Sequence, residues 1–143
     1  MNKRSIQPVG EVMEISQVKA IVTGAASGLG AATAQVLRDS GAQVTIFDRD
    51  AKRGAEFAAE IGAGFAQVDV ADEDSVKAGL AAAQALMGGV NALVNCAGIA
   101  VAIKTVGRDG AHPLDLFKRV IDVNLVGTFN CIRLVSEAMA NNA

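Results

Sequence analysis

The chain has 143 residues, 51% of them hydrophobic, and a formal net charge of −2. This length suits one domain, and the slightly acidic balance lacks the basic footprint of a nucleic-acid-binding protein. No apolar run approaches the roughly 20 residues that a membrane-spanning helix needs. We therefore expect a protein without nucleic-acid or membrane partners.

The N-terminal segment 1–15 lacks the apolar stretch of a signal peptide. We expect either a disordered leader or an upstream start, with the working start at Met13. Cys96 and Cys131 lie in apolar contexts, which is typical of reduced, buried thiols in a cytoplasmic protein. Two cysteines and the single His112 are too few to predict a metal site.

Short apolar strands and alanine-rich helices alternate from residue 18 onward. We expect strands at about 18–23, 43–48, 64–70 and 91–95, and helices at about 28–40, 51–61, 72–87 and 113–141. Strands that are almost wholly apolar are typical of a sheet covered by helices on both faces. The alternation predicts right-handed strand–helix–strand units. The fold class is therefore α/β, a doubly wound parallel sheet with strand order 3-2-1-4, formed by residues 16–143.

The C-terminal part begins with a long loop, 99–113, and such loops are often functional. In the helix that follows, a turn of about 100° per residue groups Asp115, Arg119 and Asp122 in one polar stripe, which continues through Arg133 and Glu137. Asn124 projects about 180° from that stripe on the same helical wheel. We therefore expect Asn124 to be buried, with its amide hydrogen-bonded.

The run Thr23–Gly30 stands between the first strand and the first helix. Glycine permits positive φ and close backbone approach, so Gly24 suits a tight strand exit. Gly28 and Gly30 allow a helix to approach the sheet and leave room for a ligand. The first amides of a helix lack intrahelical partners and carry positive potential, which favours a phosphate group. We predict a pyrophosphate cradle with Ser27 and Leu29 among its residues; the alternative is a plain strand–helix turn.

Two acidic residues follow later strands. Asp48 ends the second strand, 18 residues after Gly30, where a carboxylate accepts hydrogen bonds from an adenosine ribose and repels a 2′-phosphate. This favours NAD over NADP, although Arg49 weakens the inference and a capping aspartate is the alternative. Asp69 and Val70 end the third predicted strand. We expect Asp69 to accept from the adenine amino group, or to cap the next helix, and Val70 to line the pocket.

The fourth strand ends in Asn95, Cys96, Ala97 and Gly98. The small residues permit backbone contact with a ribose or a nicotinamide, and Asn95 is a candidate for holding neighbouring loops together. A simple strand exit is the alternative.

Together with Asp122-Val123-Asn124, these motifs resemble the short-chain dehydrogenase/reductase family over about residues 16–141. The runs 94–102 and 119–130 are similar to the type 2 3-hydroxyacyl-CoA dehydrogenases within it. The resemblance implies a Rossmann-like, NAD-binding domain with NAD contacts at Ser27, Leu29, Asp48, Asp69, Val70 and Cys96. It also implies that Asn124 is the asparagine of the family's catalytic tetrad, holding a water in the proton relay; a core asparagine satisfied by backbone is the alternative.

The resemblance also has consequences for activity. The family's catalytic Ser and Tyr-x3-Lys lie beyond the long helix, and this sequence contains no tyrosine. We expect an incomplete domain that lacks the catalytic half and is inactive alone. The implied parent oxidises a 3-hydroxyacyl-CoA, or a steroid or other secondary alcohol, as a homo-oligomer. Lys104 and Arg108 either meet CoA phosphates or are solvated loop charges. A non-catalytic NAD-binding or interaction protein is the remaining alternative.

Overall fold

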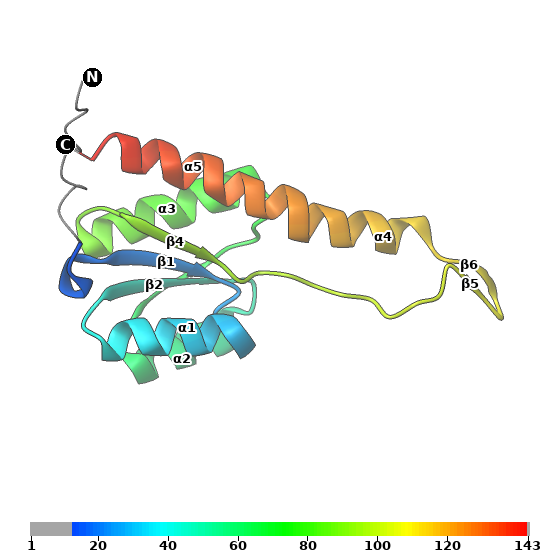
Figure 1. Cartoon of the computed structure of the whole chain (residues 1–143), viewed down its shortest axis with the longest axis horizontal. Coiled ribbons are helices and arrows are strands. Elements are labelled where there is room, and N and C mark those ends of the chain that lie inside the picture. The colour runs from blue at the N-terminus through cyan, green and yellow to red at the C-terminus, as the bar shows by residue number, and fades with distance from the viewer. Residues whose placement is uncertain (1–12, 143) are drawn as a thin grey trace, which may run out of the picture.

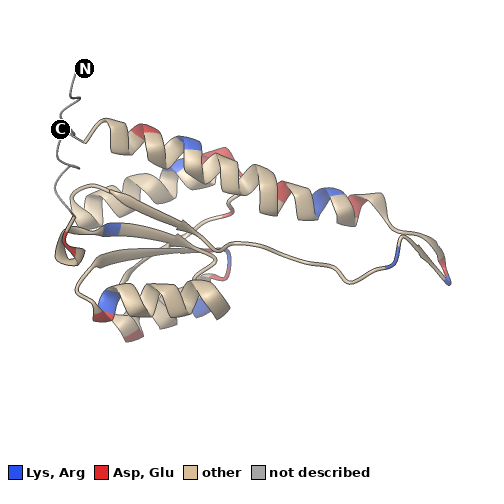
Figure 2. Ribbon diagram, viewed as in Figure 1, with Lys and Arg blue, Asp and Glu red and all other residues tan. Residues whose placement is uncertain are grey.

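The computed structural model describes residues 13–142, and its centre is a four-stranded parallel sheet (Figure 1). The strands are β1 (Lys19–Thr23), β2 (Gln43–Asp48), β3 (Gly64–Gln67) and β4 (Ala92–Asn95). Their order, β3-β2-β1-β4, confirms the order expected from the sequence. Charged side chains occur in these strands only at the ends, as Lys19 and Asp48 (Figure 2).

Helices cover both faces of the sheet. Figure 1 shows α1 (Gly28–Asp39) and α2 (Ala51–Ile61) on one face, and α3 (Glu73–Met87) and α5 (Thr128–Ala140) on the other. Successive residues of a strand point to opposite faces, so β1 contributes to two separate cores. Ile21 belongs to the core under α3 and α5, whereas Ala20 and Val22 belong to the core under α1 and α2.

The third strand is shorter than expected. We expected it to reach residue 70, but β3 ends at Gln67, which pairs with Asp48 at the end of β2. Because β3 is the outer strand of the sheet, no other neighbour extends its ladder beyond that point. Asp69 and Val70 therefore lie in the turn before α3.

The expected single helix at 113–141 is a continuous run of three segments. These are α4 (Leu114–Ile121), a π-helical segment, η2 (Asp122–Gly127), and α5. A π-helix bonds residue i to i+5, so each of its residues turns the axis by less than in an α-helix. Within η2 only Val123 and Gly127 are buried, and the residues between them, including Asn124, are exposed. The expectation that Asn124 is buried is wrong: its side chain is exposed.

The loop before α4 contains a small antiparallel hairpin, which was not expected. Its strands are β5 (Val106–Gly107) and β6 (Gly110–Ala111). Together with α4 it extends away from the sheet (Figure 1). Lys104 and Arg108 are both exposed there.

A short 3-10 helix, η1 (Ile15–Gln17), precedes β1. The expectation of a leader at 1–15 falls mostly on residues 1–12, which lie outside the described residues. Within the described part, no helix combines the length and apolar character required to cross a bilayer.

Candidate functional site

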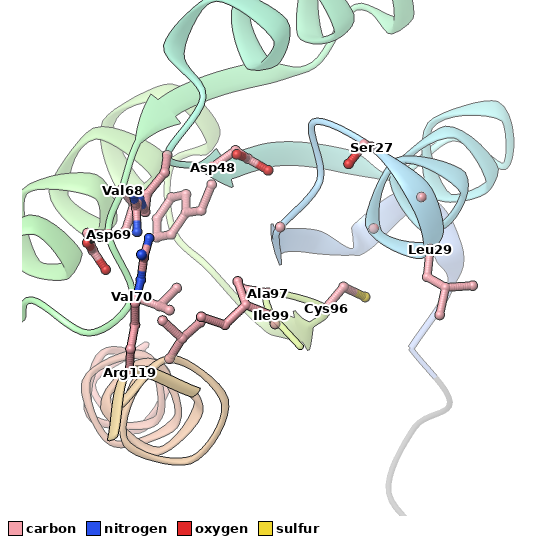
Figure 3. A pocket seen from close by; sticks show the side chains of 17 residues that line it. Ser27, Leu29, Asp48, Val68, Asp69, Val70, Cys96, Ala97, Ile99 and Arg119 are labelled. Carbon is pink, nitrogen blue, oxygen red and sulfur yellow. Dashed lines mark ion pairs between the residues drawn. The ribbon is translucent and has the colours of Figure 1, made fainter. Parts of the chain in front are cut away.

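A cavity of about 500 Å³ opens at the carboxyl ends of the strands (Figure 3). Parallel strands end at one edge of their sheet, and ligands of such folds bind outside that edge. The volume lies in the range of small-molecule and cofactor sites. Most of the predicted binding residues line it: Gly24, Ser27, Gly28, Leu29, Gly30, Asp48, Asp69, Val70, Cys96, Ala97 and Gly98.

The glycines of the first turn bring backbone segments into close contact. Gly24 has a φ of 64°, and a Cβ built on it would lie 2.6 Å from the Ala97 Cα. A Cβ on Gly30 would overlap the carbonyl group of Gly24. These two positions therefore require glycine on steric grounds, whereas Gly28 has open space around it and only its φ of 58° favours glycine.

The N-terminus of α1 differs from those of its neighbours. The side chains of Asp50 and Asp72 cap α2 and α3 by accepting from the backbone amides of Arg53 and Ser75. Ser27 occupies the N-cap of α1 but makes no capping hydrogen bond with its side chain. The first amides of α1 therefore remain available to an anion in the cavity.

Asp48 joins the glycine turn to the end of β2. Its Oδ2 accepts a hydrogen bond from the Ala26 amide at 2.9 Å, and its Oδ1 accepts one from the Asp50 amide at 2.9 Å. The Gly24 amide donates to the Phe47 carbonyl beside it at 2.8 Å. These bonds fix the orientation of the carboxylate, and each of its oxygens keeps a lone pair for a ligand donor.

The Asp69 carboxylate accepts one backbone hydrogen bond, whereas that of Asp48 accepts two. Its Oδ1 accepts from the Ala71 amide at 3.0 Å. Its Oδ2 lies 3.8 Å from Arg49 Nη1, and both side chains are substantially exposed, so this ion pair is weak. The Asp69 amide donates to the Ser75 hydroxyl at 3.0 Å and holds the turn against α3.

Thr23, rather than Asn95, ties the end of β4 to the glycine turn. The buried Thr23 hydroxyl accepts hydrogen bonds from the Cys96 and Ala97 amides, both at 3.1 Å. Asn95 is exposed, lies outside the cavity lining, and has no side-chain hydrogen bond within residues 13–142. The register accounts for this difference, because Thr23 pairs with Asn95 and so lies beside the two amides that follow it.

Asn124 anchors the start of the long loop. Its Oδ1 accepts from the Ile99 amide, and its Nδ2 donates to the Ile99 carbonyl, both at 2.8 Å. The side chain is thus held by one backbone unit, although it is exposed and keeps a second N–H and a second lone pair, and it does not line the cavity.

Sequence reasoning missed several residues of the cavity: Phe47, Val68, Ile99, Arg119 and Val123, while Arg49 was noted only as a complication. Arg119 is exposed, as its place in the polar stripe implies, but it also lines the cavity. In Figure 3 its side chain extends from the helix toward Asp69. Its spacing of four residues from Val123 places both on one helix face, and this was the signal available in the sequence.

Two features of α5 lie outside the cavity. Burial raises the pKa of the Cys131 thiol to about 11. The Glu73 carboxylate of α3 lies 2.6 Å from the Lys77 Nζ of the same helix and 2.7 Å from the Arg133 Nη2 of α5. The hydrogen bond from Lys77 and the charge of Arg133 lower the pKa of Glu73, but these exposed pairs contribute little to stability.

Known proteins are similar to this chain in sequence and in structure. It is 47% identical over 127 residues to the 3-hydroxyacyl-CoA dehydrogenase type-2 of Bos taurus, covering 86% of this chain and 49% of that protein. The corresponding Drosophila melanogaster protein is 45% identical over 132 residues, which cover 90% of this chain and 52% of that protein. The chain thus spans about half the length of these curated relatives.

Solved structures agree with this result. The 3-hydroxyacyl-CoA dehydrogenase type-2 from Mycobacterium avium superposes with a TM-score of 0.82 at 36% identity, covering 93% of this chain and 53% of that one. A 3-ketoacyl-(acyl-carrier-protein) reductase from Brucella melitensis, complexed with NADH, gives a TM-score of 0.78 at 33% identity. The match covers 86% of this chain and 50% of that one. The pattern of the short chain dehydrogenase family matches residues 18–143, and the chain belongs to that family.

Proposed function

We propose that this chain is the cofactor-binding part of an NAD-dependent oxidoreductase that converts a 3-hydroxyacyl-CoA to the 3-ketoacyl-CoA. One observation carries the proposal: the Asp48 carboxylate and the uncapped N-terminus of α1 face the same cavity and are joined through the Ala26 amide at 2.9 Å. The substrate assignment is supported by the likeness to the 3-hydroxyacyl-CoA dehydrogenases.

The residues of the cavity fit a dinucleotide. The open amides of Gly28, Leu29 and Gly30 suit a pyrophosphate, and Asp48 suits the two ribose hydroxyls of the adenosine half. Asp69 and Val70 suit the base, and the run Cys96–Gly98 suits the nicotinamide half. Asp48 favours NAD over NADP because its negative charge repels a 2′-phosphate.

The chemistry divides between the bound group and the protein. NAD supplies the hydride acceptor. The protein must also take the hydroxyl proton of the alcohol with a general base. In the family this base is a tyrosine, and the present sequence contains none. We therefore propose that this chain binds NAD weakly and does not turn over alone, and that Asn124 serves the proton relay only in a full-length parent.

The exposed apolar side chains of α4 favour a partner and a second candidate function. Leu114 and Phe117 are 65% and 54% exposed. We propose that the full-length parent is a homo-oligomer. We also propose that it is cytoplasmic, which agrees with the free thiols of Cys96 and Cys131. The second candidate is a non-catalytic NAD-binding protein that pairs through α4. Sedimentation of the chain with and without NAD tests this, because pairing of the chain that depends on NAD would favour the second candidate.

The proposal is tested by titrating the chain with NAD and by assaying NADH formation with 3-hydroxybutyryl-CoA. Asp48→Asn is expected to weaken NAD binding at least ~10-fold, as for the loss of a charge-assisted hydrogen bond. Asp109→Asn, which changes an exposed aspartate of the hairpin, is the matched control and leaves the affinity unchanged. Equal affinities for both variants would contradict the ribose assignment, and NADH formation by the purified chain would contradict its inactivity.

A further inference from the structure

The wall of the cavity at Val70 is not held in place by the sheet. Because β3 ends at Gln67, Val70 has no partner in the strand ladder. Val70 is 6% exposed and lines the cavity, and within residues 13–142 its carbonyl accepts no backbone hydrogen bond. A buried carbonyl without a partner is costly. The position of this wall therefore depends on side chains from other elements.

Asn130 of α5 supplies the missing partner. Its side chain is 6% exposed, and its Nδ2 donates to the Val70 carbonyl at 2.9 Å. About one turn earlier, a Cβ built on Gly127 would lie 2.6 Å from Val70 Cγ2, so the helix backbone touches the Val70 side chain. The long helix thus contacts Val70 at two points, its carbonyl and its side chain.

Arg133 fixes the direction of the Asn130 amide. Its Nη2 donates to Asn130 Oδ1 at 2.9 Å and lies 2.7 Å from Glu73 Oε2 in the first turn of α3. A guanidinium only donates and a backbone carbonyl only accepts, so a single orientation of the amide satisfies both Arg133 and Val70. The exposed Glu73–Arg133 pair contributes little to stability, but it keeps the Asn130 donor directed at Val70.

We propose that Asn130 is a positioning residue of the cavity and that Arg133 orients it; the inference rests on the proposed dinucleotide function. Asn130 does not line the cavity, so it acts through Val70. Without the Nδ2 donor, the buried carbonyl turns toward another partner, and the wall moves with it. A side chain behind the wall therefore determines how well the cavity is formed before a dinucleotide binds.

The test compares the NAD affinities of variants of the 143-residue chain by ligand-observed NMR, which reports weak binding. Asn130→Leu keeps the number of side-chain heavy atoms and removes the donor. We expect the NAD affinity to fall about tenfold, which is equivalent to the loss of one hydrogen bond. Met139→Ala is the control for general loosening, because it truncates a partly buried side chain of α5 that lies about 13 Å along the helix from Asn130. It should lower the urea midpoint and leave the NAD affinity unchanged.

A second pair of variants tests the orienting role of Arg133 at the surface, where substitutions usually leave the fold intact. Arg133→Met frees the Asn130 amide, and we expect NAD affinity to fall about threefold. Lys77→Met is the matched control, because Lys77 also pairs with Glu73 but makes no hydrogen bond to Asn130. It should leave the NAD affinity unchanged. If Asn130→Leu does not fold, this pair decides the proposal.

Hydrogen exchange inside the turn separates positioning from stability. The Ala71 amide donates to Asp69 Oδ1 at 3.0 Å, one residue beyond Val70. Its exchange rate, measured relative to the amides of β1, should rise about tenfold in Asn130→Leu, because the turn opens locally. The same relative rate should stay constant in Met139→Ala.

Four outcomes overturn the proposal. If Asn130→Leu and Arg133→Met both bind NAD like the wild-type chain while Asp48→Asn still weakens it, the positioning role is wrong and the dinucleotide function stands. If Met139→Ala weakens NAD as much as Asn130→Leu, the effect is general loosening. If Lys77→Met weakens NAD as much as Arg133→Met, the effect is surface charge. If the wild-type chain does not bind NAD, the proposed function fails and the positioning role falls with it.

Discussion

Large apolar side chains are buried in one region of the molecule and exposed in another. The first region is the sheet with its covering helices (the sheet body, residues 13–98 and 128–140). The second is the protruding arm (residues 99–121). In the sheet body, Ile21 and Ile46 are completely buried. In the arm, Leu114 and Phe117 are more than half exposed. Helices of both regions, such as α2 and α4, combine apolar and charged residues. The difference arises because the helices of the strand–helix–strand units pack on the sheet, whereas no other element of the described chain packs over the arm (Figure 1).

The cavity is built mainly by the sheet body and only to a small extent by the arm. The glycine turn, Asp48 and Asp69 belong to the sheet body and are held by its backbone hydrogen bonds. From the arm, only Ile99 and Arg119 line the cavity. The sheet body should therefore respond to mutation as a packed core does, and the arm should respond as a surface does. The following predictions test that contrast.

The largest effect is expected at Gly30 of the sheet body. Gly30→Ala places a Cβ against the backbone of Gly24 and Ala25, where no flexible side chain can yield. We expect a loss of at least ~3 kcal/mol in the free energy of unfolding, because overpacking against backbone lies at the severe end of such changes. Urea denaturation followed by far-UV circular dichroism measures it, since the chain has no Trp or Tyr.

Gly28→Ala is the control for Gly30→Ala. Gly28 also has positive φ but has no neighbour within 4 Å of a built Cβ. Only backbone strain remains, about 1–2 kcal/mol. Equal losses at the two positions would show that the α1 turn is loosely packed and that close approach is not required there.

The next effect is a core truncation in α3. Leu80 is 8% exposed and belongs to the core under α3 and α5. Leu80→Ala is expected to cost about 2–3 kcal/mol, the lower part of the range for buried leucines, because the site lies near the surface. The denaturation midpoint should fall with little change in the urea dependence. A cost below ~1 kcal/mol would place α3 with the arm rather than with the sheet body.

A third prediction uses pH to test whether water is excluded from the Cys131 thiol in the core of the sheet body. Burial raises the pKa of Cys131 from its ordinary 9.0 to about 11. Between these values the unfolded chain loses the thiol proton while the folded chain retains it. This contribution to stability is therefore complete below pH 9 and is lost as the pH rises to 11. The loss is on the order of 2–3 kcal/mol.

The Cys131→Ala variant isolates this contribution from other alkaline titrations. The difference in unfolding free energy between the wild-type chain and the variant should shrink as the pH rises from 9 to 11. A difference that stays constant over this interval would mean that the thiol is hydrated in the folded chain.

The sequence predicted the sheet body well for identifiable reasons. The expected bounds of β2 and α2 match the structure, because the Asp50 cap and the left-handed Gly62 mark the ends of α2 plainly. The convergence of the glycine turn, Asp48 and Asp69 follows from parallel strands that end at one edge. The early end of β3 was not predictable from its apolar run, because it depends on where β2 stops.

The helix beyond the arm was harder to predict. A π-helical segment has no strong signal in a single sequence, and the helix is buried on the face of Val123 and Gly127 rather than on the face opposite the polar stripe, where Asn124 was expected to be buried. Arg119 was missed for a related reason. A charged residue on a helical wheel is read as solvent-facing, and only the docking of Gly127 and Asn130 against Val70 reveals that the helix passes the cavity.

The smallest effect is expected in the arm, where Leu114→Ala repeats the chemistry of Leu80→Ala on a side chain that is 65% exposed. At micromolar protein concentration we expect a change within ~0.5 kcal/mol, as for an ordinary surface substitution. The same measurement at a tenfold higher concentration tests for a second copy, because pairing stabilises the folded chain by mass action. If Leu114→Ala costs as much as Leu80→Ala at both concentrations, the arm is packed within the chain, and the contrast between the two regions fails.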